Sequence, residues 1–115
     1  MEVQHTVDKA VKVLTATIAS SGTTSSAVNL FGCTAVSFEV PSAFTGTSMT
    51  FEASIDGGVT FKQLRSQDGI AVTYIVAADG IYTLSANTFA GVDQLKFVAD
   101  AQASERAIKL KPFII

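Results

Sequence analysis

Cysteine and tryptophan are almost absent from this chain of 115 residues, which contains one Cys and no Trp. Cys33 therefore has no partner for an internal disulfide and no companion for a cysteine-based zinc site. Its neighbours between Phe31 and Val36 are mostly small or apolar, so we expect a buried and unreactive thiol. The cysteine content thus favours neither redox chemistry nor a structural metal.

Charged residues are also scarce, at 16% of the chain, with a net charge of −2 and a pI of about 5.1. A soluble domain usually carries about 25% charged residues. We therefore expect either unusually extensive burial or a surface that a partner covers. A nucleic-acid interface needs clustered Lys and Arg, and this chain has no such cluster. The densest basic group, Arg106, Lys109 and Lys111, fits the solvated face of a strand.

Long apolar runs are missing as well. No run reaches the roughly 18 residues that cross a membrane. The first residues, Met1 to His5, lack the apolar core of a secretion signal. We therefore predict that the protein is made in the cytoplasm and does not associate with a membrane.

What the chain does contain is period-two alternation of apolar and polar residues, which indicates half-buried β-strands. The segment from Met49 to Ile55, for example, places Met49, Phe51, Ala53 and Ile55 on one face. The clear alternating segments are Val36–Val40, Met49–Ile55, Leu95–Ala99 and Ile108–Lys111, and the less regular ones are Val11–Ile18, Gly69–Val76 and Ile81–Leu84.

Turn signals containing Gly separate these segments, for example at Asp56–Gly58, Asp68–Gly69 and Asp79–Gly80. Their spacing is close to the roughly 8–12 residues expected of a sandwich or barrel. We predict an all-β fold, an antiparallel two-sheet β-sandwich with eight or nine short strands. The lack of Trp and of an inter-sheet disulfide favours jelly-roll over immunoglobulin-like connections. The sandwich domain would span residues 11–115, preceded by an N-terminal arm, residues 1–10, that either frays or orders against a partner.

The most specific local pattern is the segment from Ser54 to Phe61, Ser-Ile-Asp-Gly-Gly-Val-Thr-Phe. It resembles the Asp-box, best known from sialidase propellers, with Phe61 where Trp is commoner. The resemblance implies a structural role, in which the Asp accepts backbone N–H groups, Gly takes a positive φ and the aromatic packs beneath the hairpin. One copy in so short a chain excludes a propeller. The predicted structural turn consists of Ser54, Asp56, Gly57, Gly58, Thr60 and Phe61.

Catalytic and ligand-binding patterns are absent. A glycosidase needs two carboxylates that face each other, whereas Asp56, Asp68 and Asp79 each lie in an Asp–Gly turn that explains them. Their spacing matches no calcium loop. The single histidine, His5, precedes the first predicted strand and lacks the rigid setting of a triad base. We predict no catalytic residue, no metal site, no cofactor and no enzymatic activity.

Four segments together are similar to small structural proteins encoded beside the major capsid protein of tailed bacteriophages. They are Thr15–Gly22, Ser25–Leu30, Val40–Thr45 and Met49–Phe61, and the resemblance covers about residues 13–65. It implies a jelly-roll cement (decoration) protein on the outer surface of the virion head, which joins neighbouring subunits of the major capsid protein. It also implies a homo-oligomer, with a homodimer across two-fold seams favoured over a homotrimer.

Two uncharged segments are candidates for burial against another subunit. The strand Ala71–Val76 would otherwise invite uncontrolled pairing at its edge, and the apolar C-terminus would otherwise expose apolar surface. The candidate interface residues are His5, Val7, Tyr74, Val76, Phe113, Ile114 and Ile115.

Two other functions remain open for a fold of this class. One is a phage tail or fibre component, and the other is a carbohydrate-binding β-sandwich module. A carbohydrate module usually presents a row of exposed aromatic side chains. Here Tyr74 and Tyr82 are the only tyrosines, and most of the eight Phe alternate into the predicted core.

Overall fold

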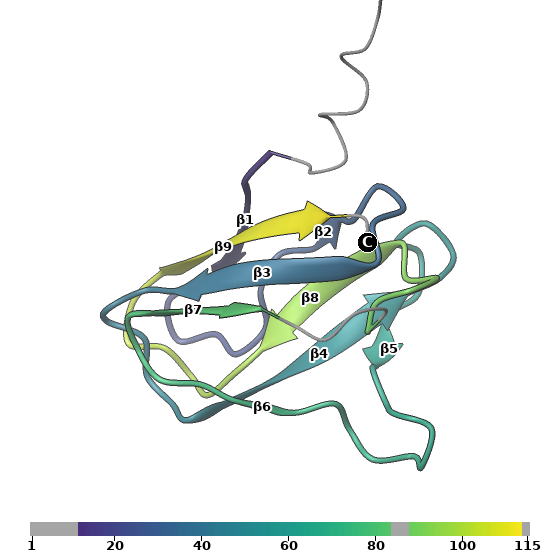
Figure 1. Ribbon diagram of the computed structural model, residues 1–115. Coiled ribbons are helices and arrows are strands. Elements are labelled where there is room, and N and C mark those ends of the chain that lie inside the picture. The colour runs from purple at the N-terminus through teal and green to yellow at the C-terminus, as the bar shows by residue number, and fades with distance from the viewer. Residues whose placement is uncertain (1–11, 84–87, 114–115) are drawn as a thin grey trace, which may run out of the picture.

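The computed structural model describes residues 12–83 and 88–113, which form nine strands and no helix. The strands build a four-stranded sheet in the order β1-β9-β3-β7 and a five-stranded sheet in the order β2-β8-β4-β5, with β6 paired to the start of β4. Figure 1 shows the two sheets as the layers of a sandwich. The strands are β1 (Leu14–Ile18), β2 (Val28–Asn29), β3 (Ala35–Val40), β4 (Ser48–Ser54), β5 (Lys62–Gln63), β6 (Tyr74–Ile75), β7 (Gly80–Thr83), β8 (Gln94–Val98) and β9 (Arg106–Phe113).

The strand pairs are nested from the ends of the domain inward. The first strand pairs with the last, β2 with β8, β3 with β7, and β4 with β5 and β6, all antiparallel. Two further antiparallel pairs, β3 with β9 and β4 with β8, complete the sheets. This is the jelly-roll arrangement. The predicted all-β, two-sheet antiparallel sandwich is therefore confirmed.

Phenylalanine side chains from both sheets meet in the core. Phe97 of β8 lies with its ring centroid 5.3 Å from Phe38 of β3 and 5.5 Å from Phe51 of β4. Phe89 makes an edge contact with Phe51 at 5.5 Å. All four rings have less than 2% of their surface exposed. Because Phe38 and Phe97 belong to different sheets, their contact helps to hold the two layers together.

Three details of the predicted strands are wrong. Ile55 is 79% exposed instead of facing inward, because β4 ends at Ser54, whose hydroxyl turns in to bind the following turn. Of the predicted strand Gly69–Val76, only Tyr74–Ile75 joins a sheet. The preceding residues pair locally instead, since Val72 N donates to Leu64 O at 3.0 Å. The two-residue strands β2 and β5 were not predicted, because two residues are too few to show alternation.

The predicted buried thiol is confirmed, since Cys33 is 2% exposed and burial raises its pKa. The predicted N-terminal arm, residues 1–10, lies outside the described residues together with its interface candidates His5 and Val7. Ile114 and Ile115 also lie outside them.

Candidate interaction surface

The turn between β4 and β5 is fixed by two side chains. Ser54 Oγ donates to Asp56 Oδ1 at 2.7 Å and accepts from Gly58 N at 2.8 Å. Asp56 Oδ1 also accepts from Thr60 N at 2.9 Å. The serine and the aspartate therefore bind backbone groups along the whole turn, which leaves its conformation little freedom.

The charge on Asp56 is stabilised by the same contacts. The Ser54 hydroxyl, and then the Thr60 N–H, donate to the carboxylate and lower its pKa to about 2. Asp56 is therefore ionised at neutral pH, and its Oδ1 is occupied by donors from its own turn. It serves as a structural acceptor at the centre of this turn.

Asp93, directly before β8, and Gln94, the first residue of β8, hold the tip of the same turn. Gly57 N donates to Asp93 Oδ2 at 3.0 Å, and Gln94 Nε2 donates to Gly57 O at 3.1 Å. Phe61 closes the predicted motif and is half-buried, with Nζ of Lys96 4.3 Å from its ring centroid. The six residues predicted to form a structural turn thus lie together, braced against one neighbouring strand.

The predicted turn at Asp68–Gly69 uses the same chemistry, although its Ser66–Asp68 hydrogen bond was not predicted. Ser66 Oγ donates to Asp68 Oδ1, and this hydroxyl lowers the pKa of Asp68 more than any other contact. Gly69 N donates to Ser66 O at 2.9 Å, and Arg65 Nη1 donates to Gly69 O at the same distance. The sequence signal was the repeated Ser-x-Asp-Gly pattern at residues 54–57 and 66–69.

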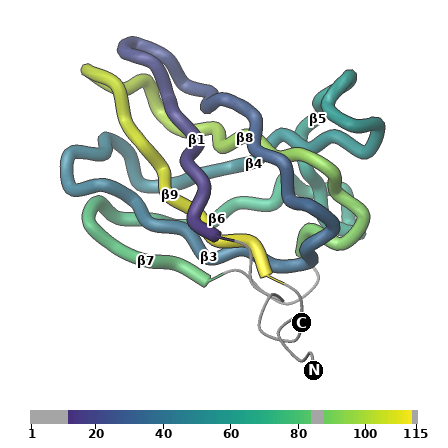
Figure 2. Tube along the Cα trace, turned by 90° about the horizontal axis from the view of Figure 1, so that it is seen from above, coloured from purple at the N-terminus to yellow at the C-terminus, as the bar shows by residue number. Residues whose placement is uncertain are grey.

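Both turns display apolar side chains to solvent. Seven large apolar side chains are exposed in the described part of the chain, and four of them lie between residues 55 and 75. Ile55 and Val59 are 79% and 82% exposed on the first turn, and Ile70 is 64% exposed on the second. Figures 1 and 2 show both turns on the side of the sandwich where β5 lies.

A surface hollow of about 410 Å³ lies beside β5. Its apolar lining includes Ala53, Ile55 and Leu64, while Lys62 and Arg65 add two positive charges and Asp56 adds one negative charge. We call the set Ile55, Val59, Lys62, Arg65 and Ile70 the β5-side surface. It combines exposed apolar side chains with cationic groups on turns that are held from within, a composition suited to recognising another macromolecule.

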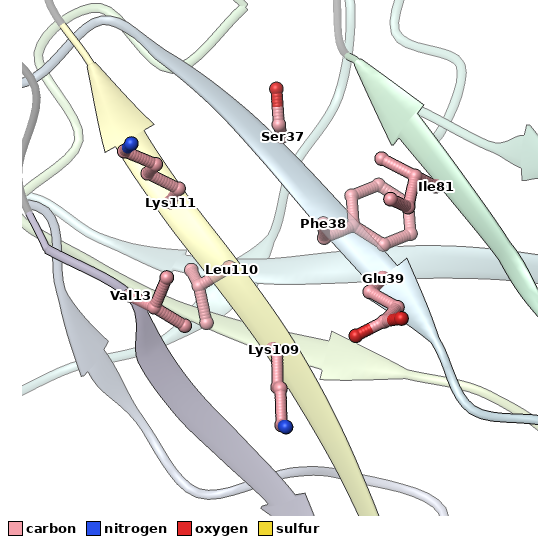
Figure 3. Close-up of a pocket in the computed structure, with 8 residues that line it drawn as sticks. All are labelled: Val13, Ser37, Phe38, Glu39, Ile81, Lys109, Leu110 and Lys111. Atoms are coloured by element: carbon pink, nitrogen blue, oxygen red, sulfur yellow. The ribbon is translucent and has the colours of Figure 1, made fainter.

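A smaller hollow of about 210 Å³ lies on the outer face of the four-stranded sheet. Figure 3 shows Lys109 and Lys111 on β9, Glu39 on β3 and Ile81 on β7 around it, with Val13 beside the start of β1. We call this site the sheet hollow. Four of its eight lining residues are apolar, and its two lysines outnumber its single acid.

The predicted interface residues that can be placed are mostly turned inward. Val76 is 3% exposed and belongs to the core, whereas its neighbour Ile75 is 78% exposed. Tyr74 is half-buried, with its ring centroid 5.8 Å from that of Phe51. Phe113 is half-buried at the end of β9, opposite Ala35. Val76 is therefore corrected from an interface residue to a core residue, because the alternation of β6 points its side chain into the sandwich.

Within residues 12–83 and 88–113, no three His, Cys, Asp or Glu residues are grouped so that they could hold a metal ion. The same residues include no helix long and apolar enough to cross a membrane. No protein-family model matches the chain, and no curated protein sequence matches it either.

Proposed function

We propose that this chain is a cement, or decoration, protein of a tailed-bacteriophage head. In this role it binds the outer surface of the expanded capsid and joins neighbouring subunits of the major capsid protein. The proposal starts from the resemblance of four segments within about residues 13–65 to phage structural proteins. The observation that carries it further is the β5-side surface, where Ile55, Val59 and Ile70 are displayed on turns fixed by Ser–Asp hydrogen bonds.

An ordered turn that presents apolar side chains is well suited to docking. When a partner covers exposed Ile and Val side chains, their removal from water stabilises the complex by roughly 25 cal/mol per Å² of apolar area. The hydrogen bonds of Ser54 and Ser66 already restrict the two turns. Binding therefore loses less conformational entropy than it would with flexible loops. The two features together favour tight association through a small number of anchor residues.

The mechanism would be additive burial across seams between capsid subunits. About 1,000 Å² of apolar area per copy corresponds to about 25 kcal/mol of gross stabilisation before the costs of association. Every copy that spans a seam adds an interface that must break before the subunits separate. Because many copies bind one shell, interfaces that are each weak together stabilise the capsid strongly.

The test uses expanded heads that lack any decoration protein and are assembled from the major capsid protein of the same phage. We expect the wild-type chain to co-sediment with these heads and to raise their melting temperature in calorimetry. The Ile55→Asp/Val59→Asp double variant should bind at least about tenfold more weakly, because it places charges where apolar contact is needed.

The matched control is Thr15→Asp/Ala107→Asp, which adds the same two charges at exposed positions of β1 and β9, in the sheet that does not contain β5. This variant should bind as the wild type does. The proposal is overturned if the wild-type chain neither binds the heads nor stabilises them, or if the double variant binds with full affinity.

The carbohydrate-binding alternative has less support. Among the ten aromatic side chains, all within the described residues, only Phe31 is exposed, so no row of exposed rings is available for sugar stacking. A glycan screen that gave millimolar or tighter binding, together with no binding to heads, would favour that alternative over a cement protein.

A further inference from the structure

The sheet hollow shares no residue with the β5-side surface, so the proposed function assigns no partner to it. We infer that it binds the N-terminal segment, residues 1–11, of a second copy of this chain, so that two copies exchange these segments. The inference concerns self-association in solution and does not depend on binding to a capsid.

The first support is the exposed apolar surface of the hollow. Val13 is 57% exposed and Ile81 is 73% exposed, and both line it together with parts of Phe38 and Leu110. Ile81 lies on β7, an edge strand of the four-stranded sheet that carries no charged residue. Edge strands without charge are uncommon on surfaces that stay uncovered, because they pair readily with other chains.

The second support is charge. In the register of β9 and β3, Lys109 lies opposite the acidic Glu39, whereas Lys111 lies opposite the uncharged Ser37. The hollow therefore has one more basic residue than acidic residues. The N-terminal segment contains Glu2 and Asp8, with Lys9 as its only basic side chain apart from the histidine. The hollow thus carries one excess positive charge, and the side chains of the segment carry one excess negative charge.

The third support is the residue pattern of the segment. In an extended chain alternate residues share a face, which would place Val3, Val7 and Val11, together with His5 and Lys9, on one side and Glu2 and Asp8 on the other. One side could then contact the apolar floor of the hollow. The other would carry the carboxylates, within reach of the flexible lysine side chains that rise beside it.

The fourth support is length. Eleven residues can extend over about 36 Å, whereas four strands span about 14 Å from the first to the last. The segment is therefore long enough to cross the sheet of another copy. Val13 itself lines the hollow, so a segment that filled the hollow of its own copy would have to reverse direction within very few residues. Reciprocal exchange avoids this reversal and closes a two-fold dimer.

Sedimentation velocity and light scattering on the full chain, at micromolar concentrations, test the inference. We expect a dimer for the wild type. The Val3→Asp/Val7→Asp variant changes the segment and Ile81→Asp changes the hollow, and each should weaken dimerisation by at least about tenfold. The Val3→Asp/Val7→Asp substitutions change no residue of the nine strands, so circular dichroism should show an unchanged fold. Ile55→Asp, on the β5-side surface, is the control and should leave the dimer intact.

Mixing and charge reversal then identify the partner surfaces. The Val3→Asp/Val7→Asp variant keeps an intact hollow, and Ile81→Asp keeps an intact segment. A mixture of the two should therefore form heterodimers under conditions in which each variant alone is monomeric. Lys109→Glu/Lys111→Glu should weaken the dimer, and adding Glu2→Lys/Asp8→Lys should restore it. A monomeric wild type, a dimer unaffected by these substitutions, or a mixture without heterodimers would each overturn the inference.

Discussion

Ser54 and Asp56 share one hydrogen bond of 2.7 Å, and through it they organise the whole turn between β4 and β5. The serine hydroxyl donates to the aspartate and accepts from Gly58 N, while the aspartate accepts from Thr60 N. Ser54 is 1% exposed at the end of β4, so the turn is joined directly to the sheet. The exposed Ile55 and Val59 are therefore carried on a rigid base.

This relationship predicts a specific loss of stability in acid. The Asp56 pKa is about 2 in the folded protein, because Ser54 and Thr60 donate to its carboxylate, against about 3.9 in an unfolded chain. A lowered pKa stabilises the fold above the unfolded value, and that contribution disappears as the pH falls from about 4 to about 2. Asp56→Asn should therefore lower the melting temperature at pH 7 and flatten its dependence on pH below 4.

Asp79→Asn is the control for this experiment, because Asp79 also lies in an Asp–Gly turn and Asn tolerates its positive φ of 63°. Melting curves between pH 2 and pH 7 compare both variants with the wild type, and Asp79→Asn shows what the same chemical change does in another Asp–Gly turn. An Asp56→Asn variant that kept the full acid dependence would show that this carboxylate contributes nothing to it.

The two glycines of the turn should respond differently to alanine. Gly57 has φ +76° and open space where a Cβ would lie, so Gly57→Ala should cost only about 1–2 kcal/mol of backbone strain. At Gly58, with φ +94°, a Cβ would lie 2.7 Å from the amide group of Gln94. Gly58→Ala should be more destabilising, because that amide must move and lose its bond to Gly57 O.

Urea denaturation measures both effects. In a Gln94→Ala background the obstructing amide is gone, so the difference between Gly57→Ala and Gly58→Ala should shrink. Equal costs in the wild-type background, or a difference that persists without Gln94, would contradict this explanation.

The sequence predicted the architecture well where strands are long and have one buried face. Val36, Phe38 and Val40 alternate with polar residues and occupy β3, with the apolar side buried as expected. Ile108 and Leu110 of β9 follow the same rule. A period of two records which face is buried, so it identifies strands and their orientation without any knowledge of their partners.

The surface features were harder to predict, because they depend on how the chain ends its strands. Ile55 continues the alternation of Met49 and Phe51, but a turn begins before it and leaves it in solvent. Val76 appeared suitable for an interface, but its place after β6 directs it into the core. The sheet hollow joins Val13, directly before β1, to residues of β3, β7 and β9, whose proximity follows from the topology and from no local pattern.

Replacing Gln102, which joins the loop before β4 to the loop after β8, should lower the stability of the fold markedly. It is 1% exposed, its Oε1 accepts from Thr45 N at 2.9 Å, and its Nε2 donates to Thr45 O and Asp100 O at 2.8 and 2.7 Å. Gln102→Leu should cost about 1–3 kcal/mol in urea denaturation, because these backbone groups lose their partners. Gln67→Leu, the same change at an exposed position, should alter stability by less than about 0.5 kcal/mol. Equal effects at the two sites would contradict a clamping role for Gln102.

Phe97 should be among the most costly residues to truncate. Its ring lies within 5.5 Å, centroid to centroid, of both Phe38 and Phe51, and it is fully buried between the sheets. Phe97→Ala should lose about 3–5 kcal/mol, since it removes this contact and leaves a cavity. The free energy of unfolding of a small domain is only about 5–15 kcal/mol. Phe97→Leu therefore provides a milder variant if Phe97→Ala does not fold. Phe31→Ala, at a ring that is 61% exposed, should cost less than about 1 kcal/mol by the same urea measurement. If Phe97→Leu and Phe31→Ala were equally stable, the core ring would not be joining the two sheets.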